Sequence, residues 1–136
     1  MAATSSRSRH PGHVVTAVVL CHSNAKLLAK TLDALAAQER PADRVVAVDL
    51  GSSDRSVSVA ADRLGADNVV RFDGPVDTAT AVAAGLDLVP TRIERRARDD
   101  APLEWIWLLH DDSAPDPAAL DELLLRVTHS PSVWLA

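Results

Sequence analysis

A run of five apolar residues that leads directly into an acidic turn constrains the fold of this chain most strongly. Residues 105–109 show no alternation of apolar and polar side chains, which is typical of a strand covered on both faces in a parallel sheet. Such a strand is expected near the centre of the sheet. His110, Asp111 and Asp112 follow it directly, and open α/β sheets bind their ligands at the carboxyl ends of strands.

The acidic turn is predicted to lead into a helix. Asp116 followed by Pro117 is typical of an N-cap and a first helical position. Apolar residues then recur at helical spacing, at Leu120, Leu123, Leu124 and Val127. The side chains at 110–112 are therefore expected in a short strand-to-helix loop. They either bind a ligand or cap the helix, and two acids beside an imidazole favour the ligand.

Strands and helices alternate along the rest of the chain. Apolar strands are predicted at 14–20, 44–48 and 68–72. One helix, capped by Ser23 or Asn24 and stopped by Pro41, is expected to bury Leu27, Leu28, Thr31, Leu32 and Leu35. Further helices are predicted at 54–64 and 77–88, the latter with Ala79, Val82, Ala83 and Leu86 facing inward. This order predicts an open, mostly parallel α/β sheet with helices on both faces.

The length of 136 residues suits one domain with its own core. Residues 1–13, rich in serine and arginine, are expected to form a disordered leader, and residues 14–136 the α/β domain. Residues 90–102 are charged and aperiodic, which predicts a surface loop. Residues 132–136 are predicted to begin a fifth strand, so we expect the domain to be incomplete at its C-terminus.

Charge and hydropathy exclude several classes of protein. A net charge of -5 argues against nucleic acid as a partner, because phosphate backbones attract an excess of Lys and Arg. No apolar run approaches the roughly 20 residues of a membrane span, and residues 1–13 lack the apolar core of a signal peptide. We therefore expect a cytoplasmic protein. Arg7, Arg9 and His10 could contact acidic lipid at the inner face of the membrane, but are too few to anchor the chain.

Polar residues follow two other predicted strands. Cys21, His22 and Ser23 come after the first strand, and Asp49 with Gly51 and Ser52 comes after the second. If these strands adjoin the one that ends at residue 109, the three loops meet in one crevice. Carboxylates there can accept from an N–H or a ribose hydroxyl and can hold a divalent cation against a diphosphate. Asp49 serves equally well as a turn former, so both interpretations stay open.

Several other kinds of site are excluded. Gly51 stands alone and no Gly-Lys-Ser/Thr follows, so neither a P-loop nor a dinucleotide fingerprint is present. This also disfavours an unrelated metal-dependent phosphotransfer enzyme. No hydrolase triad is evident, and the five histidines lack zinc-site spacing. Cys21 is the one cysteine, which excludes an internal disulfide, and a small buried filler is favoured over a nucleophile.

Three segments together, at 14–38, 45–54 and 107–117, resemble family 2 of the glycosyltransferases, which have the GT-A fold. The resemblance runs from about residue 14 to the end of the chain. It implies the Rossmann-like half that binds a nucleotide sugar, a divalent metal (manganese or magnesium), and transfer of the sugar from a nucleoside-diphosphate donor to a glycan or lipid-linked hydroxyl acceptor, as in polysaccharide or cell-wall synthesis.

The resemblance also implies roles for single residues. Cys21 and Ser23 would line the base pocket. His22, Gly51, Ser52 and Asp111 are further donor-binding candidates, and Asp111 could instead support Asp112 at the metal. Asp49 would accept a hydrogen bond from the base, and Asp112 would help to bind the metal. His110 stands where relatives carry the first aspartate of the motif and is the second candidate metal ligand. Val82 and Ala83 stand where many relatives carry an Arg-Asn pair near the donor.

Two functions follow as expectations. In the first, the chain supplies the donor and metal site of a glycosyltransferase, while the catalytic base is expected beyond Ala136, so that the isolated chain binds donor weakly without efficient transfer. In the second, it is a degenerate, non-catalytic α/β module that binds a protein partner or self-associates through an exposed sheet edge. Residues 82, 83 and 110 favour the second.

Overall fold

The computed structural model describes residues 12–89 and 103–129. It contains strands β1 (His13–Cys21), β2 (Arg44–Leu50), β3 (Val69–Phe72) and β4 (Leu103–His110). The α-helices are α2 (Ala25–Ala36), α3 (Ser56–Leu64), α4 (Thr78–Leu86) and α6 (Ala119–His129), and a short 3-10 turn, η1 (Ala66–Asn68), precedes β3. The predicted leader up to residue 11, the arginine-rich loop and the fifth strand lie outside the described residues.

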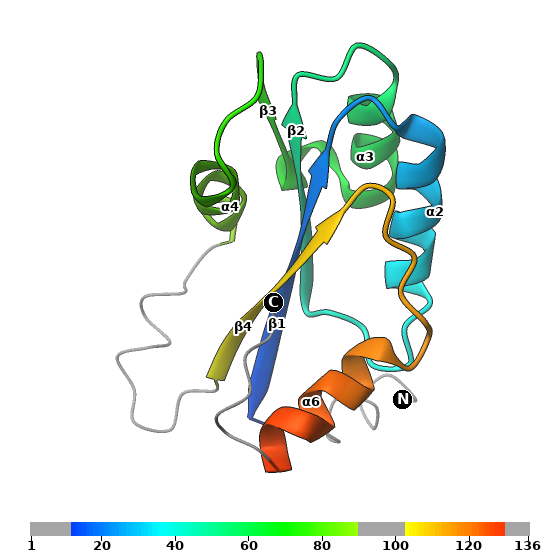
Figure 1. Cartoon of the computed structure of the whole chain (residues 1–136), viewed down its shortest axis with the longest axis vertical. Helices are drawn as coiled ribbons and strands as arrows, with labels where there is room; N and C mark the ends of the chain where they lie inside the picture. The colour runs from blue at the N-terminus through cyan, green and yellow to red at the C-terminus, as the bar shows by residue number, and fades with distance from the viewer. Residues whose placement is uncertain (1–11, 90–102, 130–136) are drawn as a thin grey trace.

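The four strands form one parallel sheet in the order β3-β2-β1-β4. Helices α2 and α3 lie on one face of this sheet and α4 lies on the other (Figure 1). Each crossover returns the chain to the amino ends of the strands, as parallel pairing requires. The predicted fold class, an open parallel α/β sheet with helices on both faces, is confirmed.

Alternation along β1 divides the core into two layers. Val15 and Val19 point towards α2 and α6, whereas Val18 and Leu20 point towards α4, because successive side chains of a strand face opposite ways. The larger layer adds Leu28, Leu32, Leu35, Trp107, Leu109, Leu120, Leu124 and Val127, and the smaller adds Val46, Val48, Ala81 and Val89. Both faces of β1 are thus buried, so β1 is the central strand in the described part of the sheet.

Strand β4 was expected near the centre of the sheet. In the described part of the chain it pairs with β1 and ends the strand order. Trp107 and Leu109 are buried against α2 and α6, but Ile106 and Leu108, on the α4 face, are only half-buried. An unbroken apolar run does not show whether a strand has one neighbour or two, and the predicted fifth strand lies outside the described residues, so the central position stays a prediction.

The inward face of α4 also differs from the prediction. Ala81 and Gly85 are buried, whereas Ala79 and Ala83 are exposed and the remaining two residues of the predicted face, at 82 and 86, are half-buried. The helix is almost wholly apolar or small, so its sequence carries little information about which side faces the sheet. A Cβ at position 85 would lie 3.1 Å from a methyl of Val48, and this close approach fixes the phase of the helix.

The remaining helices begin or end away from their predicted limits. Helix α2 ends at Ala36, before Pro41, and Leu27 is 39% exposed instead of buried. Helix α6 begins at Ala119, two residues after the predicted Pro117. The N–H of Leu120, in its first turn, donates to the side-chain oxygen of Gln38 in the loop after α2. Gly65, with φ 89°, ends α3 as predicted. None of the helices in the described ranges is long and apolar enough to cross a membrane.

Candidate functional site

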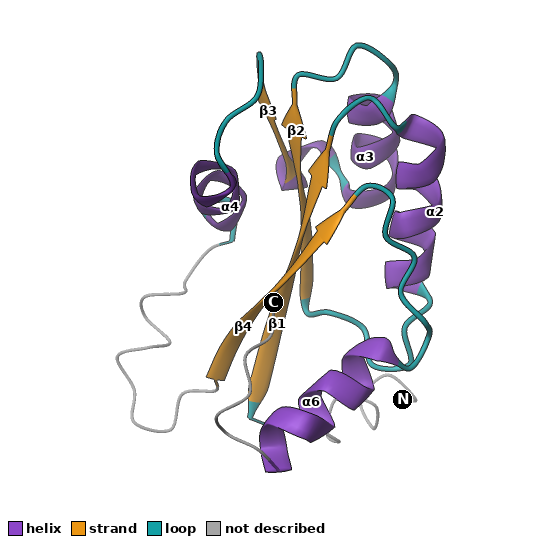
Figure 2. Cartoon of the chain, in the orientation of Figure 1, coloured by secondary structure: helices purple, strands orange, loops and turns teal. Residues whose placement is uncertain are grey.

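The three polar loops follow strands that adjoin one another. Strand β1 lies between β2 and β4, with Cys21 opposite Asp49 and Leu20 opposite His110. Because all four strands are parallel, the loops leave the sheet at one edge, as the arrowheads in Figure 2 show. We call residues 22–24 the β1 loop, residues 51–55 the serine loop, and residues 111–118 the acidic loop. The condition under which the sequence placed the three loops together, that their strands adjoin, is met.

Asp49 organises the serine loop from beneath. Its side chain is 1% exposed, and Oδ2 accepts hydrogen bonds from the N–H groups of Gly51 at 3.2 Å and Ser52 at 3.0 Å. The Ser52 hydroxyl lies 2.5 Å from Oδ1. Gly51 has φ 85°, and a Cβ there would lie 3.0 Å from the Asp73 carbonyl oxygen. Asp49 is therefore a turn former in this structure, and its remaining acceptor capacity lies below the loop surface.

The β1 loop is bonded to the serine loop through Ser23. Its N–H donates to the Ser52 hydroxyl at 2.7 Å, and its own hydroxyl accepts from the N–H of Ser53 at 3.0 Å. Ser23 has φ 51°, a conformation that non-glycine residues rarely adopt and that recurs at functional sites. His22 and Ser23 are exposed, so these two donor-binding candidates lie at the surface of this edge.

Asp54 joins the N-termini of two helices. Oδ1 accepts from the N–H of Ser56 at 3.0 Å and from its hydroxyl at 2.6 Å, which caps α3. Oδ2 accepts from the N–H of Ala25 at 3.0 Å, in the first turn of α2. The Ser56 hydroxyl and the Ala25 N–H lower the pKa of Asp54, because they bond its ionised form. The cap predicted from Asn24 is absent, since its side chain makes no capping bond.

The Asp111 side chain turns inward, whereas the side chains of His110 and Asp112 lie at the surface. It continues the face of Trp107 and Leu109, is 8% exposed, and its Oδ2 accepts from the N–H of His22 at 2.8 Å. His110 and Asp112 are both exposed. The predicted cluster of three therefore divides into one buried residue that fixes the β1 loop and two surface residues that can meet a ligand.

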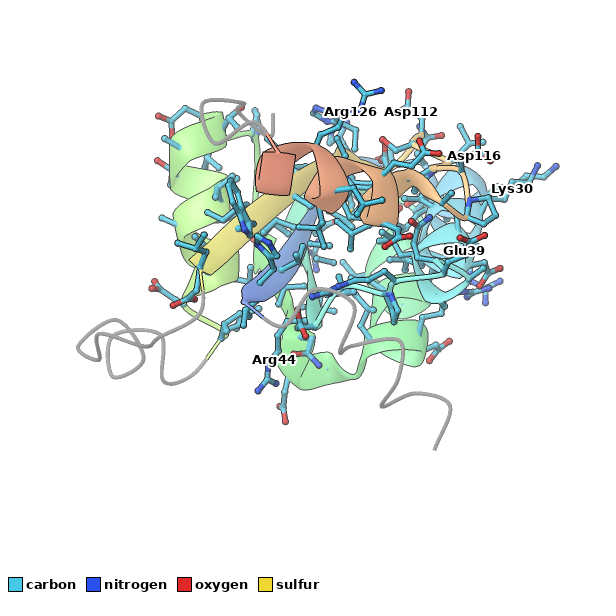
Figure 3. The ribbon with its side chains drawn as sticks, turned by 90° about the horizontal axis from the view of Figure 1, so that it is seen from below. Lys30, Glu39, Arg44, Asp112, Asp116 and Arg126 are labelled. Carbon is cyan, nitrogen blue, oxygen red and sulfur yellow. The ribbon has the colours of Figure 1, made fainter. Side chains whose placement is uncertain are left out.

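The exposed pair is the candidate metal site. Figure 3 shows the Asp112 side chain pointing outward from the ribbon. Within residues 12–89 and 103–129, no three His, Cys, Asp or Glu side chains lie close enough to hold a metal ion by themselves. Mg²⁺ is usually held by one or two carboxylates plus substrate phosphates, and the metal role expected of Asp112 and His110 stays a prediction. Imidazole as the second ligand suits manganese better than magnesium.

Cys21 lies beneath the three loops and is 1% exposed. Burial, followed in order by the negative charges of Asp111, Asp49 and Asp54, raises the pKa of its thiol to about 12. A neutral, buried thiol is a poor nucleophile, so the interpretation as a buried filler is confirmed.

The Cys21 thiol is expected to resist alkylation by iodoacetamide at pH 8 in the folded chain and to react once the chain is unfolded in guanidinium. Because its folded pKa lies above the ordinary value of 9.0, the thiol deprotonates first in the unfolded chain, and stability should fall as pH rises from 9 towards 12. Mass spectrometry of the labelled protein measures the first effect. Equal labelling of folded and unfolded protein would contradict this.

Two residues that hold the acidic loop were missed by the sequence prediction. Thr31 was assigned to an apolar stripe, but its hydroxyl donates to the Asp111 carbonyl oxygen at 3.0 Å. Gln38, just after α2, donates to the Asp116 carbonyl oxygen at 2.6 Å and accepts from the N–H of Leu120 at 3.1 Å. For Thr31 the available signal was a polar residue on an otherwise apolar helix face, because a buried polar group needs a partner.

Comparison with known proteins gives the family. A search of curated proteins returned no significant match. A family model described as glycosyltransferase-like family 2 matches residues 11–135, which is nearly the whole chain. The matched region includes all four strands and the three loops at their carboxyl ends. The chain belongs to the glycosyltransferase-like family 2, with the Rossmann-like part of a GT-A fold.

Proposed function

We propose that the three loops bind a nucleoside-diphosphate sugar and that the chain serves the transfer of this sugar to a hydroxyl acceptor. One observation carries the proposal: an exposed carboxylate, Asp112, lies at the same sheet edge as two loops that are tied together by hydrogen bonds. A diphosphate needs cationic neutralisation, and the surface pair His110 and Asp112 can hold a cation against it. Family membership supports general glycosyl transfer.

Different residues of the chain would bind the cation, contact the base and fix the loops. His110 and Asp112 would hold a divalent cation, which supplies positive charge to stabilise the leaving diphosphate. His22 and Ser23 would form the exposed wall next to the base, while Asp49 fixes the serine loop from below. Asp111 holds the β1 loop against the acidic loop, so base and diphosphate sites keep a fixed separation.

Replacing Asp112 with alanine is expected to remove the manganese-dependent part of nucleoside-diphosphate binding. Mg²⁺-type sites rely on one or two carboxylates, so loss of one should lower affinity at least about tenfold. Calorimetric titration of the chain with UDP, GDP and ADP, each with and without manganese, measures this directly. Stability should change little, because the side chain is exposed.

Asp67→Ala is the matched control, since Asp67 is an exposed aspartate in η1, before β3 and away from the three loops. It should bind all three nucleotides as the unmodified chain does. The proposal fails if the unmodified chain binds none of them, or if Asp112→Ala binds as tightly as Asp67→Ala in the presence of manganese. Self-association without nucleotide binding would instead favour the non-catalytic module.

A further inference from the structure

We propose that Thr31 and Gln38 are positioning residues, which hold the acidic loop where Asp112 can meet the metal and diphosphate of a donor. This inference rests on the proposed function of the same site. Neither residue lies at the surface of the loops, because Thr31 is 1% and Gln38 5% exposed. Both act through the backbone of the acidic loop.

Thr31 holds the backbone on each side of Asp112. Its hydroxyl contacts the carbonyl oxygens of Asp111, at 3.0 Å, and of Ser113. The residue between those two carbonyls is Asp112, so the position of its Cα follows from a hydroxyl on the face of α2. Valine has nearly the shape of threonine but no donor, and would leave these carbonyls without that partner.

Gln38 holds the far end of the same loop. Its Nε2 donates to the Asp116 carbonyl oxygen at 2.6 Å, and its Oε1 accepts from the N–H of Leu120 at 3.1 Å. Next to it, the N–H of Glu39 donates to the Pro117 carbonyl oxygen at 2.8 Å. Both ends of the primary amide are used, so glutamate cannot replace glutamine here, because it lacks the donor.

Helix α2 therefore connects the two halves of the donor site. Its N-terminus is bonded to the serine loop through the N–H of Ala25 and the carboxylate of Asp54. Its buried face and its C-terminal end are bonded to the acidic loop through Thr31 and Gln38. A rigid element bonded to both loops sets the separation between base and diphosphate sites, and such supporting contacts commonly change metal affinity about 10–100-fold when lost.

The test compares Thr31→Val and Gln38→Met with the unmodified chain, using calorimetry with manganese and whichever of UDP, GDP or ADP binds. Each variant should lose about tenfold or more of the affinity gained on adding manganese, with metal-free nucleotide binding unchanged. Thr31→Ser keeps the hydroxyl and should retain the manganese effect. In an Asp112→Ala background, Thr31→Val should have no further effect, because it acts through that carboxylate.

Leu35→Ala is the control for stability, since Leu35 is equally buried on α2 but belongs to the apolar core. It should lower the denaturation midpoint without reducing the manganese effect. If Thr31→Val and Gln38→Met bind like the unmodified chain, or lose metal-free binding to the same degree as manganese-dependent binding, the positioning role is wrong and the proposed function stands. If the unmodified chain binds no nucleotide, the proposed function fails and the positioning role fails with it.

Discussion

Asp49→Ala is expected to lower the free energy of unfolding by about 3 kcal/mol, because the N–H groups of half-buried Gly51 and buried Ser52 lose their acceptor. The N–H groups of Gly51 and Ser52 both donate to one oxygen of this carboxylate, and the Ser52 hydroxyl bonds the other. The loss should spread to the β1 loop, since Ser52 in turn accepts from the N–H of Ser23. Nucleotide binding should therefore fall together with stability.

Urea denaturation followed by circular dichroism gives the stability, and calorimetry with nucleotide gives the binding. Asp49→Asn keeps one carbonyl acceptor for the turn and should lose less stability than the alanine variant. Ser52→Ala should loosen the link to Ser23 while leaving both N–H bonds to Asp49. Unfolding of Asp49→Ala at the same urea concentration as the unmodified chain would show that the turn does not depend on this carboxylate.

Gly85→Leu is expected to destabilise the chain by more than about 3 kcal/mol, at the upper end of the range for overpacked cores. A Cβ at position 85 would lie 3.1 Å from a Val48 methyl and 3.3 Å from methyls of Val18 and Val46. All three valines are fully buried in the strands, so they have no space to move aside. The added side chain must push α4 off the sheet.

Gly74→Ala is the matched control for Gly85→Leu, because a Cβ at position 74 would meet nothing within 4 Å. Its free energy of unfolding should stay within about 0.5 kcal/mol of the unmodified chain, as for most surface substitutions. Chemical denaturation measures both variants. A Gly85→Leu variant as stable as Gly74→Ala would mean that α4 does not pack on β1 and β2 as the structure shows.

The fold was largely predictable because it follows from periodicity. Unbroken apolar runs predicted all four described strands to within a few residues. Gly65 correctly predicted the end of α3. The features that the sequence did not show depend on contacts between helices and strands. The sequence of β4 does not show how many strands flank it, and the apolar residues around α4 do not show that Gly85 faces the sheet. Tertiary packing decides both.

The site was predictable in its location but not in its internal arrangement. Parallel neighbours bring Cys21, Asp49 and His110 to one edge, as the strand ends predicted. The sequence could not separate Asp111 from Asp112, because which carboxylate turns inward depends on the N–H of His22, far away along the chain, that donates to it. Gln38 was missed for a similar reason, since its partners lie about eighty residues away along the chain.

The pairing of β1 with β4 has a consequence for folding. His13 pairs with Leu103, whereas β1 and β2 are joined by one helix, so the β1–β4 pairing closes the longest loop among the described strand pairs. Loop closure of this kind costs more chain entropy and slows folding. The carboxylate of Asp111 reaches the β1 loop only after this closure. Metal-dependent nucleotide binding would therefore report the completion of the whole sheet, whereas helix content would report its earlier, more local part.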